Sequence, residues 1–244
     1  MSKYRKEFII PYYEADRYGF IRPTTILTYM GETSSFHSES VGLGVDELKK
    51  NNHGWMLNRW KVRINSYPRV RDKIYIDTWA SDFDKFYGNR EFVIYDKDNN
   101  ELVRASSLWV FLDILKKRPK RVPIDFYNKY NMVDEKAFPS FFDFENGYVT
   151  EEEMDFCVRK SDIDYNNHVN NVKYLNWMLE AIPVEIDDNY KLKEIDINYK
   201  KEIKLGNEIK SSFIKYEEEE SNTFIHQITT DGELNAYGRT IWIK

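Results

Sequence analysis

Residues 161–180 read SDIDYNNHVNNVKYLNWMLE, and this stretch indicates more about the fold than any other part of the chain. Its first half places Asp164, Asn166 and His168 at every second position, which is typical of an irregular extended loop. Asparagines at 170 and 171 follow, and asparagine is a favourable residue at a helix N-cap. Apolar residues then recur with the spacing of a helix that buries one face, at Val172, Leu175, Leu179 and Ile182. The stretch therefore predicts a loop that leads into a half-buried helix.

This loop would bring a carboxylate, an amide and an imidazole to the N-terminus of a helix. Free backbone N–H groups and the helix dipole favour negative charge at that end. Such an arrangement suits attack on a carbonyl group, where an oxyanion must be stabilised. The alternative is purely structural, with Asp164 and Asn166 as turn residues and His168 as part of a cap. The local sequence leaves both interpretations open.

The same stretch resembles the second-half motif of the acyl-acyl carrier protein thioesterases of plant plastids and bacteria, approximately D-L-D-x-N-x-H-V-N-N-x-K-Y. The matching residues are Asp162, Asp164, Asn166, His168, Val169, Asn170, Asn171, Lys173 and Tyr174. Further matches occur in the family's order at Trp55 with Arg59, Tyr67-Pro68 with Asp72, Trp109-Val110 with Asp113, and Arg121-Val122-Pro123. Single-domain acyl-CoA thioesterases share only the D-x-N-x-H core, so the longer match favours the carrier-protein family.

The resemblance also implies a catalytic glutamate at Glu202, because Tyr199-Lys200-Lys201-Glu202-Ile203 is similar to the plant pattern E-Y-R-R-E-C. The cysteine of that pattern, once proposed as a nucleophile, is replaced by Ile203. Isoleucine has no nucleophilic group, so a thiolate mechanism cannot operate at this position. Without the family, Glu202 would be an exposed strand carboxylate between lysines and an apolar residue.

Composition narrows the possible classes of protein. Hydrophobic residues make up 41% of the 244 residues, which is enough for a sizeable core. One cysteine, Cys157, excludes an internal disulfide and a cysteine-based zinc site, and we expect it to lie in a core. A net charge of -5 argues against general nucleic-acid binding. The start of the sequence lacks an apolar signal segment, and no run approaches ~18 apolar residues, so we expect a cytoplasmic protein without a membrane span.

The two halves of the chain align with each other. An offset of 148 places Asp16 on Asp164, Leu27 on Leu175 and Met30 on Met178. Beyond the helix the offset shortens to 135, where Val62 falls on Ile197 and Ile74 on Ile209. The shortening indicates the same order of elements with shorter loops in the second half.

Each half is predicted to form a strand, a buried helix and several further strands. The first helix should begin near Pro23, and strands are expected at Met56–Asn65, Lys73–Ser81, Arg90–Tyr95 and Val103–Asp113. Asp98-Asn99-Asn100 and Asp231-Gly232 predict hairpin turns. The fold class is therefore α+β, a tandem hot-dog in which two antiparallel sheets each wrap around a central helix. We expect an N-terminal domain at 1–125, a linker at 126–147 and a C-terminal domain at 148–244.

The full polar set is present in the second half alone, and the first half retains only Asp16 from it. Tyr18 corresponds to Asn166, Phe20 to His168 and Tyr67 to Glu202. We therefore expect the first half to hold the acyl chain and the second half to carry the chemistry. The candidate residues of the acyl pocket are Tyr18, Phe20, Ile26, Leu27 and Met30, and those of a docking site for the acidic carrier protein are Lys116, Lys117, Arg118, Lys120 and Arg121. The docking cluster has an equally simple interpretation as a solvated linker.

The family implies hydrolysis of fatty acyl thioesters on acyl carrier protein, which ends fatty acid synthesis. Glu202 would activate water or attack as a nucleophile, His168 would orient Glu202 or protonate the thiolate, and Asn166 would bind the thioester oxygen or the pantetheine arm. Asp164 would orient Asn166 and His168, N–H groups near Asn170 would assist the oxyanion, and no metal or organic cofactor is expected. The alternatives are an acyl-CoA thioesterase on the same scaffold and a non-hydrolytic acyl-binding protein. The sequence determines neither the preferred length of the acyl chain nor the oligomeric state, and a homodimer is one option.

Overall fold

The structure of the chain is a computed structural model that describes residues 3–145, 147–148, 150, 152–165 and 167–244. It divides into two compact units. Unit 1 comprises Met1–Asn58 and Ile64–Pro139, and unit 2 comprises Arg59–Arg63 and Ser140–Lys244. Asn166, which supplies the amide of the predicted loop, lies outside the described residues.

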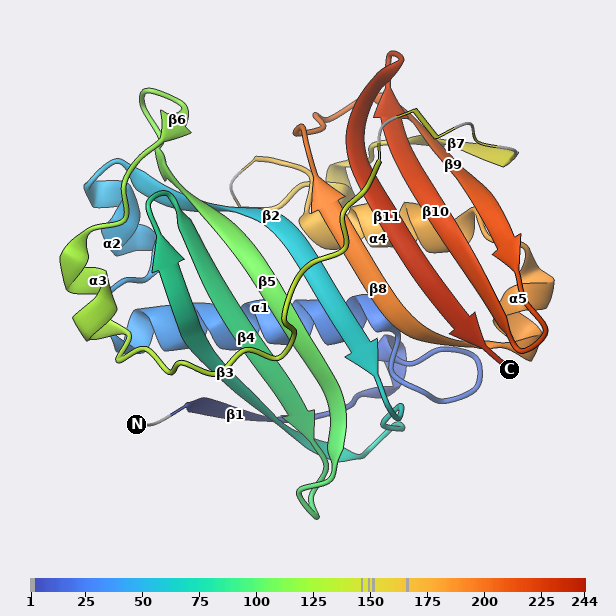
Figure 1. Ribbon diagram of the computed structural model, residues 1–244, viewed down its shortest axis with the longest axis horizontal. Coiled ribbons are helices and arrows are strands. Elements are labelled where there is room, and N and C mark those ends of the chain that lie inside the picture. Colours follow the sequence, from blue (N-terminus) through green and yellow to red (C-terminus); the bar gives the residue numbers. More distant parts are fainter. Residues whose placement is uncertain (1–2, 146, 149, 151, 166) are drawn as a thin grey trace. The chain divides into compact units, whose positions relative to one another are not determined.

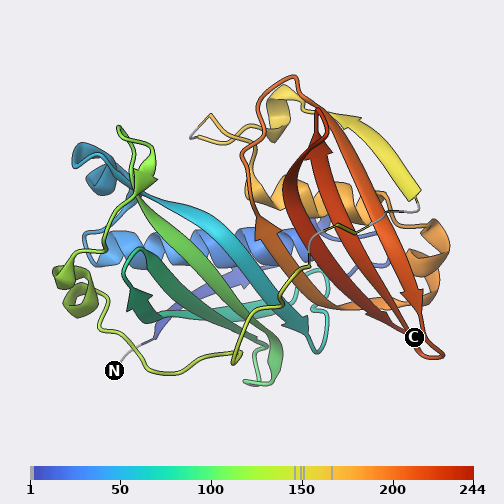
Figure 2. The same ribbon diagram turned by 45° about the horizontal axis from the view of Figure 1, so that its top comes forward.

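Unit 1 is an antiparallel sheet with one long helix against it (Figures 1 and 2). The strands are β1 (Tyr4–Ile9), β2 (His53–Ile64), β3 (Lys73–Asp84), β4 (Tyr87–Tyr95), β5 (Glu101–Asp113) and the short β6 (Arg118–Pro119). They are ordered β1-β3-β4-β5-β2, and the pairing from β1 to β5 is antiparallel. The long helix is α1 (Pro23–Ser40), and two short helices, α2 (Val45–Lys50) and α3 (Ile124–Lys129), complete the unit.

Unit 2 repeats this plan with a shorter main helix. Its strands are β7 (Glu152–Cys157), β8 (Lys191–Tyr199), β9 (Glu208–Glu217), β10 (Ser221–Thr230) and β11 (Glu233–Ile243). They are ordered β8-β11-β10-β9-β7 with antiparallel pairing, and Arg59–Arg63 of β2 pairs with the other edge of β8. The helices are α4 (Asn171–Glu180), which contacts β9, β10 and β11, and the short α5 (Val184–Asn189).

Both long helices begin where the sequence predicts. Pro23 occupies the first turn of α1, where its missing N–H leaves no internal hydrogen bond unmade. Asn170 is the N-cap of α4, and its side-chain oxygen accepts from the N–H of Val172 at 3.0 Å. Gly238 on β11 allows α4 to lie close, because a Cβ at this position would collide with the sulfur of Met178. Among the described residues, no helix is long and apolar enough to cross a membrane.

The internal repeat is confirmed element by element. α1 and α4 begin 148 residues apart, at Pro23 and Asn171, and the 3-10 turns Tyr12–Glu14 and Lys160–Asp162 have the same separation. β3 and β9 begin 135 residues apart, at Lys73 and Glu208. The hairpin turns also lie where predicted, with positive φ angles at Asn99, Asp231 and Gly232. The second half therefore has the same element order, with α4 reduced to 10 residues from the 18 of α1.

The position at which the chain divides into two units can be compared with the linker predicted at 126–147. α3 lies partly in this range, and it places Phe126 and Tyr130 in a buried cluster with Phe83 and Phe111. The clustering of contacts puts the division between Pro139 and Ser140. The first unit thus extends into the expected linker, because two aromatic side chains of that segment complete its core. The exact domain limits stay a prediction.

The prediction that Cys157 lies in a core is wrong. The residue is exposed at the end of β7, the outermost strand of unit 2. Five of the six residues of β7 are exposed, so this strand pairs with β9 without burying a face. Strand pairing alone does not cover side chains, and a sequence pattern cannot show which strand will lie at the edge of a sheet.

Candidate active site

The loop that carries His168 is closed by its own backbone. Ile163 and Val169 form a short antiparallel bridge, and the N–H of Asp164 donates to the carbonyl of His168 at 2.8 Å. One oxygen of the Asp164 carboxylate accepts from the N–H of His168 at 3.2 Å. Asn167 takes a positive φ of 61°, a conformation that asparagine tolerates better than most residues. The carboxylate of Asp164 thus fixes the backbone from which the imidazole projects.

Unit 1 contains the same loop without the imidazole. Ala15 and Ile21 form the corresponding bridge, and the carboxylate of Asp16 accepts from the N–H of Phe20 at 2.9 Å. Gly19 has a φ of 80° at the position that corresponds to Asn167. Since the aspartate serves the loop backbone where phenylalanine stands in place of the histidine, Asp164 has a structural function that is independent of chemistry. Asp164 is predicted to orient Asn166 and His168, and the bond from the His168 backbone N–H is one way in which its carboxylate holds this loop.

His168 and Glu202 come together from separate segments of unit 2. The imidazole Nδ1 lies 3.6 Å from a carboxylate oxygen of Glu202. Both side chains are 54% exposed, so water and a substrate can reach the pair. The distance is slightly too long for a hydrogen bond, but catalytic contacts often shorten when substrate is bound. The pair offers a base and a proton donor at one accessible point.

The segment that carries Glu202 is anchored on both sides of the residue. The N–H groups of Lys200 and Lys201 donate to the carbonyl of Asn235, at 2.8 and 3.1 Å. The carbonyl of Lys201 accepts from the hydroxyl of Tyr174 at 3.4 Å and from the amide of Asn235 at 3.5 Å. The side chain of Ile203 is buried. Glu202 therefore projects from a backbone that is held in place, although it lies beyond the end of β8.

Tyr174 and Asn235 are contributions that sequence reasoning missed. Tyr174 is part of the quoted motif, but nothing in its spacing shows that its hydroxyl reaches a carbonyl 27 residues away. It is buried, and burial together with the charge of Glu202 raises its pKa, so the hydroxyl stays protonated and can donate. Asn235 is fully buried on β11, with its side-chain oxygen bonded to Thr230 at 2.9 Å. A buried polar residue inside a strand is the one signal that could have indicated it.

The start of α4 is fastened to the chain before the loop. The N–H of Asn170 donates to the carbonyl of Asp162 at 2.9 Å, and the N–H of Lys173 donates to the carbonyl of Asn170 at 2.8 Å. The Asp162 carboxylate is buried beside Arg159 and Lys173. Burial alone would raise the pKa of this carboxyl group, but the hydrogen bonds from Arg159 and Lys173 outweigh burial, and the pKa is lowered. The N–H of Val172 donates to the side-chain oxygen of the N-cap residue Asn170. The donors at Asn170, Val172 and Lys173 already have partners and are not available to an oxyanion.

These features can be compared with proteins of known family. Models for the acyl-ACP thioesterase N-terminal domain and C-terminal domain match residues 1–130 and 148–244. The chain belongs to the acyl-ACP thioesterase family. It is 33% identical over 218 residues to a chloroplast palmitoyl-acyl carrier protein thioesterase of Arabidopsis thaliana, covering 82% of this chain and 52% of that protein. It is 27% identical to an oleoyl-acyl carrier protein thioesterase of Coriandrum sativum, covering 96% and 68%.

Solved structures agree with this membership. A Lactobacillus plantarum protein described as an oleoyl thioesterase has a TM-score of 0.91 at 26% identity, covering 100% of this chain and 96% of that one. A 12:0-ACP thioesterase of Umbellularia californica has a TM-score of 0.87 at 23% identity, covering 98% and 92%, and shows the likeness of fold. The predicted tandem hot-dog fold is confirmed. The chain spans about half the length of the Arabidopsis relative.

The other predicted site residues of this family member lie in unit 1. Ile26, Leu27 and Met30 are buried on α1, as an interior pocket requires. Tyr18 is 39% exposed beside the guanidinium of Arg17, so this ring belongs to the surface. Phe20 is half-buried and lies against Arg69 and Tyr67. The cluster from Lys116 to Arg121 (Lys116, Lys117, Arg118, Lys120 and Arg121) is exposed throughout. No group of three or more potential metal ligands occurs in the described parts of the chain.

Proposed function

We propose that this chain hydrolyses fatty acyl thioesters of acyl carrier protein to free fatty acid and carrier thiol. The observation that carries the proposal is the contact between His168 and Glu202, formed by two segments that both match the family motifs. Family membership and the names of the curated relatives support the same substrate class. A cytoplasmic location and a homodimeric state remain predictions from the sequence.

The chemistry needs a base, a proton donor and an oxyanion partner. Glu202 takes a proton from water while the oxygen of that water attacks the thioester carbon, or its carboxylate attacks directly and forms an anhydride that water then hydrolyses. In both routes the C–S bond breaks, and His168 supplies the proton to the leaving thiolate. A general base of this kind contributes ~10²–10⁴-fold to the rate. Since the pair lies in solvent, its reacting geometry depends on the anchored backbone rather than on burial.

Asn166 and Asp164 complete the proposed set. Asn166 donates to the thioester oxygen or holds the pantetheine arm; loss of one oxyanion donor typically costs ~10²–10³-fold in turnover. Asp164 acts through the loop backbone, as its bond to the N–H of His168 indicates. The mechanism requires no thiol, because isoleucine stands at position 203 and Cys157 is exposed on β7, a strand distinct from the loop and the Glu202 segment.

The test compares one acyl group on two carriers. The purified chain is given the same acyl thioester on acyl carrier protein and on coenzyme A, and both free thiol and fatty acid are measured. We expect the larger kcat/KM with the carrier protein. Faster turnover of the coenzyme A ester would make the chain an acyl-CoA thioesterase. Retained fatty acid without turnover of either ester would identify a binding protein instead.

The proposed docking site for the carrier is the exposed cluster from Lys116 to Arg121, in and beside β6. Two of its lysines have partners, since the Nζ of Lys120 lies 2.6 Å from the His53 ring and the Nζ of Lys116 lies 3.9 Å from Asp113. Lys117 and Arg121 are therefore the residues to reverse. Changing both to Glu should raise the KM for carrier-bound substrate and leave a small acyl thioester unaffected, an effect that salt weakens. As a control, Lys49 and Lys97, which are also exposed, are both changed to Glu. An equal rise in the KM for carrier-bound substrate in the two double variants would exclude the cluster as the docking site.

A further inference from the structure

Two loops of unit 1 lie side by side. One comprises residues 10–22, between β1 and α1, and the other comprises residues 65–72, between β2 and β3. Their backbones are joined by hydrogen bonds, such as that from the N–H of Arg71 to the carbonyl of Ile10 at 2.9 Å. The first loop is the counterpart of the loop that carries His168 in unit 2. The two loops therefore form one held surface and not two independent segments.

The side chains that this surface presents to solvent are aromatic and cationic. Tyr12 and Tyr13 are 69% and 77% exposed, and Ile9, at the end of β1 beside them, is also exposed. The exposed cations of the two loops are Arg17, Arg22, Arg69 and Arg71. Exposed apolar side chains that gather in one place commonly mark an interaction site.

The arginines are held against the rings. The guanidinium of Arg71 lies 4.6 Å from the centre of the Tyr12 ring, and that of Arg69 lies 4.5 Å from the centre of the Phe20 ring. Within the residues that the structure describes, neither of these arginines nor Arg22 forms an ion pair with a carboxylate. Three guanidinium groups are thus positioned at the surface with their charge available to a partner.

The carboxylates of the same two loops serve the loops themselves. Asp16 accepts from two backbone N–H groups of its own loop. Asp72 accepts from the N–H of Arg69 at 2.7 Å, and Glu14 accepts from the hydroxyl of Tyr29. Negative charge is therefore directed to internal donors, whereas the guanidinium groups face solvent.

The internal repeat shows that the loops do not require these arginines. Arg71 has a φ of 72°, and its counterpart in unit 2 is Gly206 with a φ of 82°; positive φ suits glycine and is uncommon for other residues. Arg22 stands at the N-cap of α1 without a capping hydrogen bond, whereas its counterpart Asn170 caps α4. At both positions the local structure favours the residue of unit 2. Arginine against local preference is expected where a side chain serves a function.

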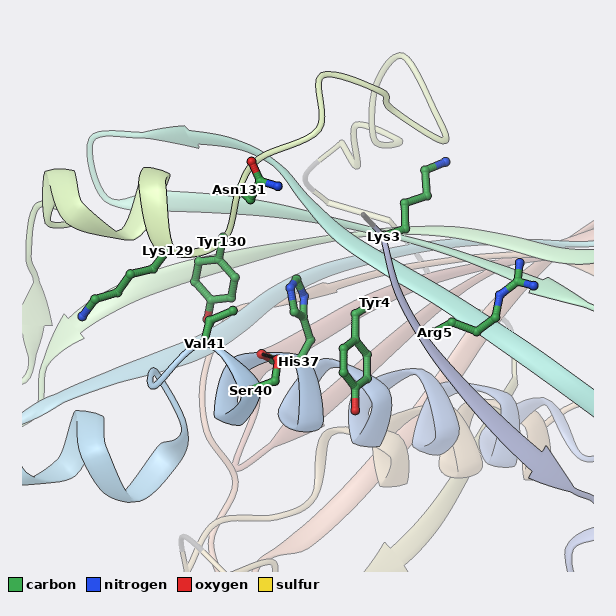
Figure 3. A pocket seen from close by; sticks show the side chains of 9 residues that line it. All are labelled: Lys3, Tyr4, Arg5, His37, Ser40, Val41, Lys129, Tyr130 and Asn131. Atoms are coloured by element: carbon green, nitrogen blue, oxygen red, sulfur yellow. Dashed lines mark hydrogen bonds between the residues drawn. The ribbon is translucent and has the colours of Figure 1, made fainter. Parts of the chain in front are cut away.

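The cations around the pocket of unit 1 lack this property. The pocket has a volume of about 340 Å³, and its lining includes His37, Lys3, Arg5 and Lys129 (Figure 3). Figure 3 shows the head groups of the three cations pointing away from the His37 ring. Each of them pairs with a carboxylate, at 2.7, 2.6 and 3.2 Å, and the partners in turn are Glu135, Asp77 and Asp125. Their charge is balanced within the unit, so this pocket is a weaker candidate for an anionic partner.

A bilayer that contains anionic phospholipid matches both kinds of side chain on the loop surface. The planar guanidinium binds phosphate oxygens through paired hydrogen bonds. Tyrosine rings lie favourably at the level of the headgroups, with their apolar body towards the acyl chains. The two needs are met at adjacent depths of one interface.

We propose that the surface formed by Tyr12, Tyr13, Arg22, Arg69 and Arg71 docks the chain peripherally on an anionic phospholipid bilayer. This function lies beyond hydrolysis, and it keeps the chain beside the phase into which a released fatty acid partitions. Each arginine near such a membrane contributes about fivefold to the affinity. The net charge of the chain is -5, so the attraction is local to these loops and salt weakens it.

The test measures vesicle binding by flotation. The purified chain is mixed with phosphatidylcholine vesicles that contain about one-third phosphatidylglycerol, and separately with vesicles of phosphatidylcholine alone. We expect binding to the anionic vesicles that is at least ~10-fold tighter than to the neutral ones and that weakens as salt is raised. Equal binding to both vesicles, or binding to neither, refutes the proposal.

The decisive variant carries Arg22→Asn and Arg71→Gly, the residues found at these positions in unit 2. The fold should be kept or stabilised, because Asn caps a helix and Gly suits positive φ. The affinity for anionic vesicles should fall about fivefold for each arginine, or ~25-fold together. The matched control, Lys97→Gln with Lys191→Gln, removes the same charge from exposed positions elsewhere and should keep the parent affinity. Tyr12→Ser with Tyr13→Ser should weaken binding while its salt dependence is kept.

The remaining outcomes separate lipid from an acidic protein. A folded double arginine variant with the parent vesicle affinity refutes the proposal, and so does an equal loss in the lysine control. If the arginine variant instead raises the KM for an acyl-carrier-protein thioester and the parent binds no vesicles, the surface docks the carrier and the lipid assignment is wrong. Should Arg71→Gly disturb the fold, Arg22→Asn alone decides, with an expected fivefold loss. Vesicle binding requires no turnover, so failure of this proposal and failure of the proposed hydrolysis are distinguishable.

Discussion

Replacing Glu202 with Gln distinguishes a catalytic pair from a surface ion pair. Glutamine keeps the shape and removes the charge, the basicity and the nucleophilicity. Both partners are 54% exposed, and exposed pairs typically contribute about 0–1 kcal/mol to stability. For a chain of this size, that corresponds to a fall in Tm of at most about 4 °C. As a base, Glu202 should contribute ~10²–10⁴-fold to turnover, or about 2.7–5.5 kcal/mol of the barrier.

The experiment therefore compares two readouts of one substitution. Thermal unfolding gives the cost in stability, and single-turnover hydrolysis of an acyl-carrier-protein thioester gives the cost in rate. Glu153→Gln is the matched control, because Glu153 is a 55% exposed glutamate of unit 2 that pairs with Lys210 across β7 and β9. We expect both variants to change Tm little and the Glu202 variant alone to lose at least ~10²-fold in rate.

His168→Ala and the double variant extend the comparison. Residues that act as one unit are not additive, so the double variant should be about as slow as the slower single variant. Independent contributions would instead multiply. A folded Glu202→Gln protein that hydrolyses at close to the parent rate would refute the assignment and leave the contact between His168 and Glu202 as an ordinary surface pair.

Three further predictions concern unit 2. Tyr174→Phe should lower kcat by about fivefold with little change in KM, because one hydrogen bond to the Lys201 carbonyl, ~1 kcal/mol, positions Glu202; an unchanged kcat would show that the Asn235 contacts suffice. Cys157 is exposed and should react with thiol reagents, yet alkylation and Cys157→Ala should each leave hydrolysis intact, so inactivation by both would place this thiol in the mechanism. Burial lowers the pKa of His226 to about 3, from a value near 6.5 in the unfolded chain, so the unfolded chain binds the extra proton first as the pH falls. The free energy of unfolding should therefore decrease below about pH 6.5, by up to ~1.4 kcal/mol per pH unit. Urea unfolding between about pH 7 and pH 5 measures this decrease, which should be smaller in His226→Gln.

Much of the fold could be predicted because its signals are local. The cap at Asn170, the proline at the start of α1 and the positive-φ turn residues each act within a few positions of the chain. The repeat added long-range information, since the offsets of 148 and 135 predicted the element order of one half from the other. The strand limits were less accurate at their ends, as for β2, which begins at His53 rather than Met56. Strand ends depend on the pairing partner, which alternation along one strand does not describe.

The candidate site was predictable only in part. The sequence by itself determined the family, the loop that carries His168 and the identity of Glu202 as a candidate, because motif residues close together in the chain are visible without a fold. The tertiary structure decided that His168 meets Glu202, that Tyr174 and Asn235 hold the Glu202 segment, and that Asp164 bonds to backbone.

The same division applies to burial. Alternation in β4 shows that Arg90 and Glu91 lie on opposite faces, but both are buried, since α1 contributes His37 against one face and the segment with Ala137 covers the other. In β7 the edge position leaves Cys157 exposed. A one-dimensional pattern records the period of a strand, whereas exposure depends on which distant elements pack against each face. That packing is set by contacts across the whole unit, and it is what only the folded chain decides.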